Sequence, residues 1–142
     1  AWAQVALATG VSDYATGTWT PTVGGSGGQS GQVYSSQSGN YTKVGNAVFF
    51  RYAVVLSTLG TITGQVQVAG LPFTISGTVF TTIGWDATTT SYVNMGGFAL
   101  NGGTIITLRA VTAAATSSIA TALAQADLSN TTGFFGAGVY FV

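Results

Sequence analysis

The chain has 142 residues, of which 46% are hydrophobic and 12% aromatic, while only three are basic and three acidic. Because it has no His, Cys or Glu, the composition excludes the usual zinc sites, disulfides, and Ser-His-Asp or Cys-His catalysis. Disorder is excluded as well, since disordered chains contain few aromatic and β-branched residues.

The content of charged residues is the most unusual property. A typical soluble domain is about a quarter charged, against 4% here. A neutral, apolar surface associates with other surfaces unless something covers it, so we expect burial in an assembly with copies of itself. Three scattered cations cannot form the basic patch that nucleic acid binding needs. The longest apolar run, residues 47–56, is too short for a membrane helix and contains Arg51, so no membrane insertion is expected.

The first elements are expected to be an arm and an edge strand. Residues 1–12 are interpreted as an arm that connects to a longer chain or packs on a neighbouring subunit, and residues 13–142 as one domain. A strand is predicted over residues 18–23, with Trp19, Pro21 and Val23 on one side. Pro21 lacks an N–H group, which indicates an edge strand or a strand start. Residues 24–31, rich in Gly and Ser, are predicted to form a flexible loop.

Residues 39–44 and 47–57 are typical of a β-hairpin with a Gly45-Asn46 turn. One face of its second strand is uniformly large and apolar, which predicts the core: Val48, Phe50, Tyr52, Val54 and Leu56. The opposite face, with Phe49, Arg51 and Val55, is less polar than a solvated face would be. We interpret it as a face that a second layer or, preferably, a neighbouring subunit covers.

Further strands are predicted over residues 64–70, 79–85, 91–100, 104–111 and 134–142, with a turn at residues 101–103. Only residues 113–128 lack a strand pattern. They are predicted to form a long loop with at most one helical turn. Short strands separated by turn residues predict an all-β fold, either a sandwich or a barrel.

Few side chains could carry catalysis. The only carboxylates are Asp13, Asp86 and Asp127, which lie in three separate segments. A glycosidase needs two carboxyl groups roughly 5 to 10 Å apart, and the enzymatic alternative that we weigh is a pair formed across subunits of an oligomer. No catalytic residue, metal or cofactor is therefore predicted, and the chain is not expected to be an enzyme.

Carbohydrate recognition remains open, because an aromatic platform beside polar side chains is typical of sugar-binding surfaces. Trp85, Asp86, Tyr92 and Asn94 offer this combination near an expected loop. The alternative is that Trp85 is simply the last inward residue of the strand that contains Ile83.

Three motifs resemble a module at the C-termini of many bacteriophage tail-fibre, head-fibre and appendage proteins. They are D-Y-x-x-G-T-W-T-P at residues 13–21, G-x-Y-T-K-V-G at residues 39–45 and G-L-P-F at residues 70–73. Their order and approximate spacing agree with that family. The chain departs from the pattern at Ala15 and Thr16, where acidic residues are common.

The resemblance implies a virion structural protein with a jelly-roll-like antiparallel β-sandwich, commonly a homotrimer. It implies partners among other virion proteins and host attachment, with a host-surface glycan as a further candidate partner. Two alternatives remain: a capsid-decorating or cement protein, and a glycan-processing enzyme with a site between subunits. For the motif residues we expect structural roles: Trp19 anchors the first strand, the Lys43 stem covers apolar surface, and Pro72 fixes a turn.

Overall fold

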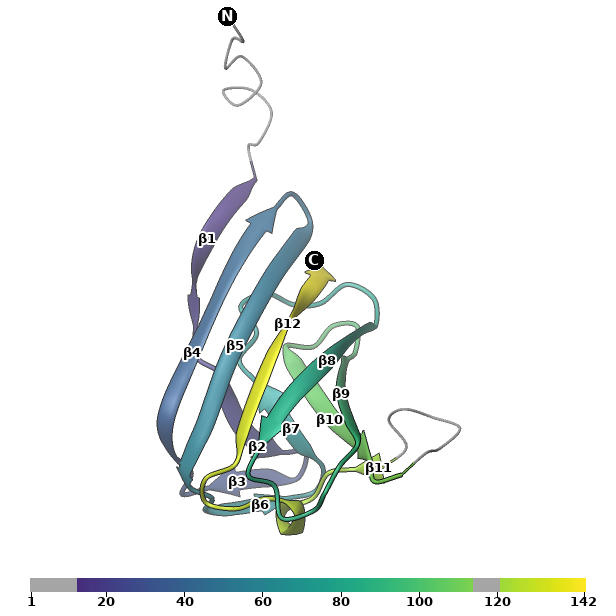
Figure 1. Ribbon diagram of the computed structural model, residues 1–142. Coiled ribbons are helices and arrows are strands. Elements are labelled where there is room, and N and C mark those ends of the chain that lie inside the picture. Colours follow the sequence, from purple (N-terminus) through teal and green to yellow (C-terminus); the bar gives the residue numbers. More distant parts are fainter. Residues whose placement is uncertain (1–12, 114–120) are drawn as a thin grey trace, which may run out of the picture.

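The computed structural model describes residues 13–113 and 121–142, and most of these residues lie in antiparallel strands (Figure 1). The predicted all-β fold is therefore confirmed. No helix in this part of the chain is long and apolar enough to cross a membrane. The elements are β1 (Tyr14–Trp19), β2 (Thr22–Gly25), β3 (Gly28–Ser30), β4 (Val33–Val44), β5 (Ala47–Thr58), β6 (Thr61–Thr63), β7 (Val66–Ala69), β8 (Val79–Asp86), β9 (Asn94–Ala99), β10 (Ile105–Val111), β11 (Thr121–Ala122), the 3-10 turn η1 (Gln125–Asp127) and β12 (Gly133–Phe141).

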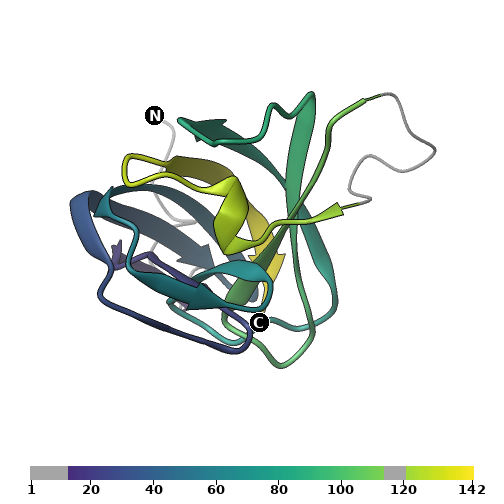
Figure 2. The same ribbon diagram turned by 90° about the horizontal axis from the view of Figure 1, so that it is seen from below.

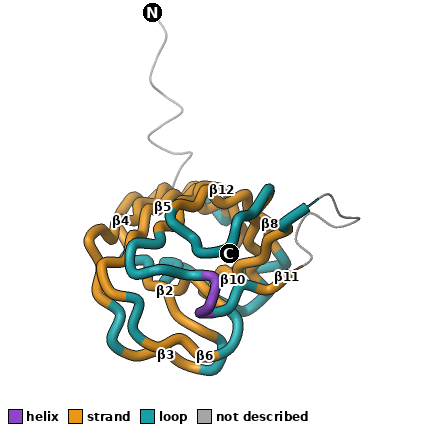
Figure 3. The backbone as a smooth tube through the Cα atoms, turned by 60° about the horizontal axis from the view of Figure 1, so that its bottom comes forward, coloured by secondary structure: helices purple, strands orange, loops and turns teal. Residues whose placement is uncertain are grey.

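Most of the strands form one sheet that curls back on itself. Its order is β1-β4-β5-β12-β8-β9-β10-β7-β2, with β11 paired to β10. Figure 3 shows β4, β5, β12 and β8 along one side and β2 and β10 on the other. Strand β8 belongs to both layers, because residues 79–82 pair with β9 and residues 83–86 pair with β12. The result is an antiparallel β-sandwich, and we call the layer of β1, β4, β5, β12 and the end of β8 the front layer.

The first strand prediction was right about burial and wrong about continuity. Trp19, Pro21 and Val23 are all buried, as their alternation predicted. However, β1 ends at Trp19 and pairs with β4, whereas β2 starts at Thr22 and pairs with β7 in the other layer. Pro21 lies between them, where its missing N–H group breaks no ladder. The chain thus crosses here from one edge of the curled sheet to the other.

The predicted hairpin is present and longer than expected on its first strand, since β4 starts at Val33. Gly45 has a φ of 59°, which a turn residue without a side chain adopts at no steric cost. The inward side of β5 was predicted correctly and forms the centre of the core: Val48, Phe50, Tyr52, Val54 and Leu56 are all at most 5% exposed.

The first two sequence motifs meet where β1 pairs with β4. Gly39 is opposite Trp19 in the register, and the indole ring covers the glycine so closely that a Cβ there would lie 2.6 Å from the ring. Trp19 also packs edge-on against Tyr52, with ring centroids 5.6 Å apart. In the same way, Gly17 leaves room for the Tyr41 ring. Trp19 anchors the first strand, as expected.

The third motif completes this packing. Gly70 has a φ of 103° and a backbone that approaches the Thr20 carbonyl, which no side chain would tolerate. The chain then bends at Pro72 and Phe73. Phe73 packs edge-on against Tyr41 at 5.1 Å, so all three motifs share one cluster of contacts. The Lys43 side chain is only 12% exposed, and its ammonium group reaches the Asp13 carboxylate at 2.5 Å.

The described chain enters and leaves the front layer at the same end. The Gly45 N–H donates to the Asp13 carbonyl at 2.8 Å, and the Val142 N–H donates to the Asn46 carbonyl at 2.9 Å. We call the opposite end, with residues 24–31, 59–65, 87–93 and 121–132, the loop end (Figure 2).

One prediction at the loop end needs correction. Residues 24–31 are not a featureless loop, because residues 28–30 form β3 and pair with β6. Within residues 113–128, the described part agrees with the prediction of at most one helical turn, the 3-10 turn at residues 125–127, and differs from it only in the short strand β11. Residues 1–12, the expected arm, lie outside the described residues, as do residues 114–120. The β3 strand was missed because its pairing partner β6 is distant in sequence.

Candidate functional site

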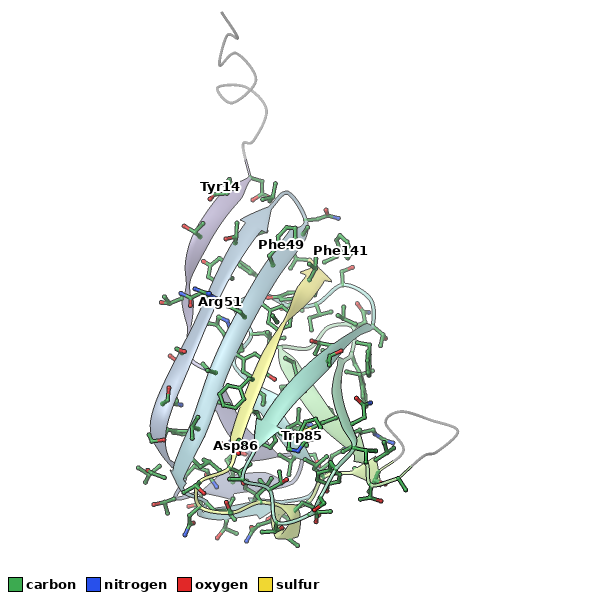
Figure 4. All side chains as sticks on the ribbon, viewed as in Figure 1. Tyr14, Phe49, Arg51, Trp85, Asp86 and Phe141 are labelled. Carbon is green, nitrogen blue, oxygen red and sulfur yellow. The ribbon has the colours of Figure 1, made fainter. Side chains whose placement is uncertain are left out.

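The outward side of the front layer carries large apolar side chains. On β5, Phe49 is 50% exposed, Arg51 is exposed and Val55 is half-buried, all three pointing away from the core. Figure 4 shows Phe49 and Arg51 on the face toward the viewer, with Phe141 beside them at the end of β12. Within the described chain, no second layer covers these residues, so the subunit leaves them open.

Strand β12 extends this surface. Its register places Val139 opposite Phe49, Ala137 opposite Arg51 and Phe135 opposite Ala53. Phe135 and Val139 are 39% and 38% exposed, and Phe141 at the end of the strand is 50% exposed. We call the set Phe49, Val55, Phe135, Val139 and Phe141, together with Arg51, the front face.

The sequence analysis identified the β5 half of this face and missed the β12 half. The signal was the alternation of Phe135, Val139 and Phe141 with the buried Phe134 and Tyr140, but only the register brings it next to Phe49.

A shallow hollow of about 500 Å³ lies on the front face. Phe49, Val139 and Ala137 give it an apolar floor, while Asn40 and Thr42 of β4 supply polar groups at its side. A second hollow of about 260 Å³ adjoins it, lined by Ser38, Asn40, Arg51, Tyr52 and Ala53. Arg51 lines both hollows. The arrangement suits an apolar partner surface that also provides hydrogen-bond acceptors for one guanidinium group.

The four candidate residues for carbohydrate recognition lie at the loop end. Trp85 and Asp86 close β8 beside Phe134 and Gly133 of β12. Trp85 is partly exposed and its ring also packs against the core, in line with the inward positions of Thr81 and Ile83. Asp86 is exposed, and Figure 4 shows both residues at the lower end of the front layer.

The other two candidates lie in the loop that follows β8 and at the start of β9. Tyr92 is partly buried and packs against the core, and Asn94 is the first residue of β9. Burial, followed by a hydrogen bond to the Asp127 carboxylate and the negative charge of that group, raises the pKa of Tyr92 to about 12. Tyr92 is therefore neutral at physiological pH and donates to Asp127.

Asp127 organises the loop end. Its carboxylate accepts from the Ala124 N–H at 2.9 Å and from the Thr90 hydroxyl at 2.7 Å, besides the bond from Tyr92. Burial opposes ionisation of this group, but these hydrogen bonds outweigh it and hold the pKa of Asp127 below its ordinary value. Because the Thr89 N–H also donates to the Asp127 carbonyl, residues 87–93 are fastened to η1. The sequence analysis did not anticipate this role, since Thr90 and Asp127 are far apart in sequence.

The three carboxylates have separate surroundings. Asp13 is paired with Lys43 at the end where the chain enters, Asp86 closes β8, and Asp127 is enclosed by the bonds given above. In residues 13–113 and 121–142 there is no group of three or more His, Cys, Asp or Glu residues that could hold a metal ion.

No protein-family model matches the chain, and no curated protein matches it either. Among solved structures, the chain is similar to the crystal structure of the Dettilon tailspike protein (gp208), with a TM-score of 0.65 and 20% sequence identity. The match covers 90% of this chain and 24% of the tailspike chain, so this sequence spans about a quarter of that protein's length. At this identity the likeness shows a shared fold: the chain has the fold of one part of a tailspike.

Proposed function

We propose that this chain is a non-enzymatic structural domain of a bacteriophage particle, from a trimeric fibre or tailspike-like appendage that works in attachment to the host surface. The observation that carries the proposal is the front face. A subunit that exposes Phe49, Phe135, Val139 and Phe141 on the same side of one layer, in a chain with six charged residues, presents a surface typical of subunit interfaces. The shared fold with part of a tailspike supports the phage context.

The position of the loop end fits attachment. The chain enters the front layer at Tyr14, at the end away from Trp85 and Asp86. A connection to a fibre through residues 1–12 would therefore leave the loop end pointing outward. Trp85, Asp86, Tyr92 and Asn94 would then be repeated on every subunit, and several weak sugar contacts on one particle raise the overall avidity.

The oligomeric state tests the assembly directly. Light scattering coupled to size exclusion should give the mass of a trimer for the unmodified protein. Phe49→Asp should convert it to monomers, because a charge would replace a side chain that the interface buries. Val93→Asp is the matched control: Val93 is 64% exposed in the loop before β9, away from the front face, and its substitution should leave the trimer intact.

Two further measurements, binding to assembled capsids and polysaccharide viscosity, separate the alternatives. A monomer that binds only to assembled capsids would refute the fibre proposal and favour capsid decoration. A loss of viscosity when the protein is added to bacterial surface polysaccharide would favour a glycan-processing enzyme with a site between subunits.

A second experiment tests recognition at the loop end. Purified bacterial surface polysaccharides are added to the protein, and tryptophan fluorescence is followed. Asp86→Ala should weaken any binding that shifts this signal, while Tyr14→Ala at the opposite end should not. Equal binding by both variants would remove Asp86 as a candidate.

A further inference from the structure

The side chains of Trp85 and Asp86 leave β8 on opposite faces. Successive residues of a strand alternate between its two sides, and the Trp85 ring packs against the core on the same side as the buried Ile83. Asp86 is exposed and follows the outward positions of β8. Trp85 is therefore not the aromatic ring that lies beside the Asp86 carboxylate.

Phe135 supplies an aromatic ring on the outward side. Strand β12 pairs Gly133 with Asp86 on one side and with Val55 on the other, and Phe135 follows two residues later on the same face. The Phe135 ring turns back over Gly133, because a Cβ at that glycine would lie 3.1 Å from the ring Cζ and 3.2 Å from Cε2. A Val55 methyl carbon would be 3.2 Å from the same point. The ring thus fills the space between Val55 and Asp86.

The ring and the carboxylate are close enough for one sugar unit to contact both. The Cβ positions of directly paired residues are about 5 Å apart, and the Phe135 ring covers the Gly133 position that Asp86 faces. Gly133 is buried beneath the ring, whereas Phe135 itself is 39% exposed. The ring therefore lies along the sheet and offers its remaining surface to solvent.

The backbone that carries Asp86 is held in place. Asp86 belongs to the ladder between β8 and β12, and the carbonyl of the next residue, Ala87, accepts from the hydroxyls of Ser129 at 2.7 Å and Thr132 at 2.8 Å. These bonds fix the direction in which β8 ends. A group that is already held in position loses less conformational freedom when a ligand binds.

The charges around this surface favour an uncharged ligand. Arg51 is opposite Ala137, four residues along β12 from Gly133, which corresponds to about 13 Å. Lys43 is engaged in an ion pair at the end where the chain enters. No basic side chain of the described front layer therefore lies beside Asp86. A carboxylate accepts strong hydrogen bonds from sugar hydroxyls, but it repels an acidic sugar.

We propose that Phe135 and Asp86 form a binding site for a neutral hexopyranose unit of a host-surface polysaccharide. The C–H face of the sugar packs on the Phe135 ring, and its hydroxyls donate to the Asp86 carboxylate. The inference rests on the sugar recognition proposed above for the loop end. It makes Phe135 the aromatic contact in place of Trp85.

The site is compatible with the proposed trimer. Phe135 is the aromatic residue of the front face that lies nearest the loop end, whereas Phe49 and Phe141 lie toward the opposite end of the layer (Figure 4). An interface over Phe49 and Phe141 therefore leaves Phe135 at its margin. A threefold rotation keeps height along its axis, so every copy presents the site at the same level.

Titration with short oligosaccharides tests the site, because a monovalent ligand removes the effect of avidity. The probes are neutral hexose oligosaccharides and matched oligosaccharides that contain a uronic acid, followed by ligand-observed NMR. The unmodified protein should bind the neutral probes about tenfold more tightly than the acidic ones. Phe135→Ala should raise the Kd for the neutral probes about tenfold, and Phe135→Trp should restore binding. Asp86→Asn should raise the same Kd and reduce the preference over the acidic probes.

Phe80→Ala is the matched control for the loss of an exposed ring. Phe80 is 53% exposed near the start of β8, where it is paired with Phe98 of β9, away from Asp86. Its substitution should leave the Kd unchanged. Light scattering on every variant keeps assembly separate from sugar binding, and circular dichroism should show that all variants fold.

The outcomes distinguish this site from the proposed function. If Phe135→Ala binds the neutral probes as tightly as the unmodified protein, the Phe135 site is refuted, while a loss of polysaccharide binding in Asp86→Ala would leave recognition at the loop end standing. A Phe135→Ala variant that loses the trimer but keeps the Kd assigns the ring to the subunit interface and also refutes the site. An unmodified protein that prefers the acidic probes, or binds no neutral probe, overturns the inference. The trimer is judged by its mass alone.

Discussion

At Gly39 on β4, one added methyl group should be costly because of a single aromatic ring. A Cβ at this position would lie 2.6 Å from the Trp19 ring, which is shorter than any normal van der Waals contact. The ring cannot easily retreat, because Trp19 is 7% exposed and packs edge-on against Tyr52. Gly39→Ala must therefore displace the tryptophan that anchors β1.

The size of the effect follows from two opposing contributions. Overpacking a well-filled core costs about 1 to 3 kcal/mol. Gly39 does not have a positive φ, so alanine gains about 0.5 to 1 kcal/mol over glycine in a strand. The net loss in free energy of unfolding should be about 1 to 2 kcal/mol, which corresponds to a fall in Tm of about 3 to 6 °C for a domain of this size.

The assay is guanidinium unfolding at fixed protein concentration, with Gly84→Ala as the matched control. Gly84 also lies in a strand, but a Cβ there would be 3.7 Å from the nearest atom, so the substitution should be neutral or stabilising. The cost of Gly39→Ala should also disappear in a Trp19→Phe background. If Gly39→Ala proves as harmless as Gly84→Ala, or costs the same with phenylalanine at position 19, the steric explanation is refuted.

Three further substitutions test other parts of the fold. Phe134→Ala removes a fully buried ring and should lower the free energy of unfolding by about 3 to 5 kcal/mol, measured by the same denaturation; a loss below 1 kcal/mol would contradict its place in the core. The pKa of Asp127 lies below its ordinary 3.8, so its contribution to stability is complete above that pH and is lost as the pH falls through the folded value. Asp127→Asn should therefore flatten the decline in Tm below about pH 4, and it should lower the pKa of Tyr92 from about 12, as followed by tyrosinate absorbance. Ala87→Gly relieves a positive φ and should leave Tm nearly unchanged, whereas Ala53→Gly within β5 should cost about 0.5 to 1 kcal/mol; equal losses would show that Ala87 is unstrained.

Local pattern was sufficient where neighbours in sequence are neighbours in space. The alternation over residues 47–57 predicted which side chains of β5 are buried, and Gly45-Asn46 predicted the turn that pairs β5 with β4. The motif glycines were not interpreted from the sequence: Gly17 and Gly39 leave space for Tyr41 and Trp19, and these contacts appear only when β1 pairs with β4.

Pairing between distant segments was outside the reach of the sequence. No local pattern predicts that residues 28–30 pair with β6. Nor does one predict that the Asp127 carboxylate accepts hydrogen bonds from Thr90 and Tyr92, in a loop that precedes it by more than thirty residues. The break at Pro21 was also not predictable, because the buried residues Trp19, Pro21 and Val23 alternate as in a single strand although the chain changes layer between them.

The front face shows most clearly what the sequence determined and what only the tertiary structure decided. Composition alone predicted that a partner covers an apolar surface of this chain, because only six charged side chains are spread over 142 residues. Which apolar residues form that surface was decided by the tertiary structure. Strand register, which is set by long-range backbone pairing and core packing, places Val139 beside Phe49 and leaves Arg51 and Asp86 apart.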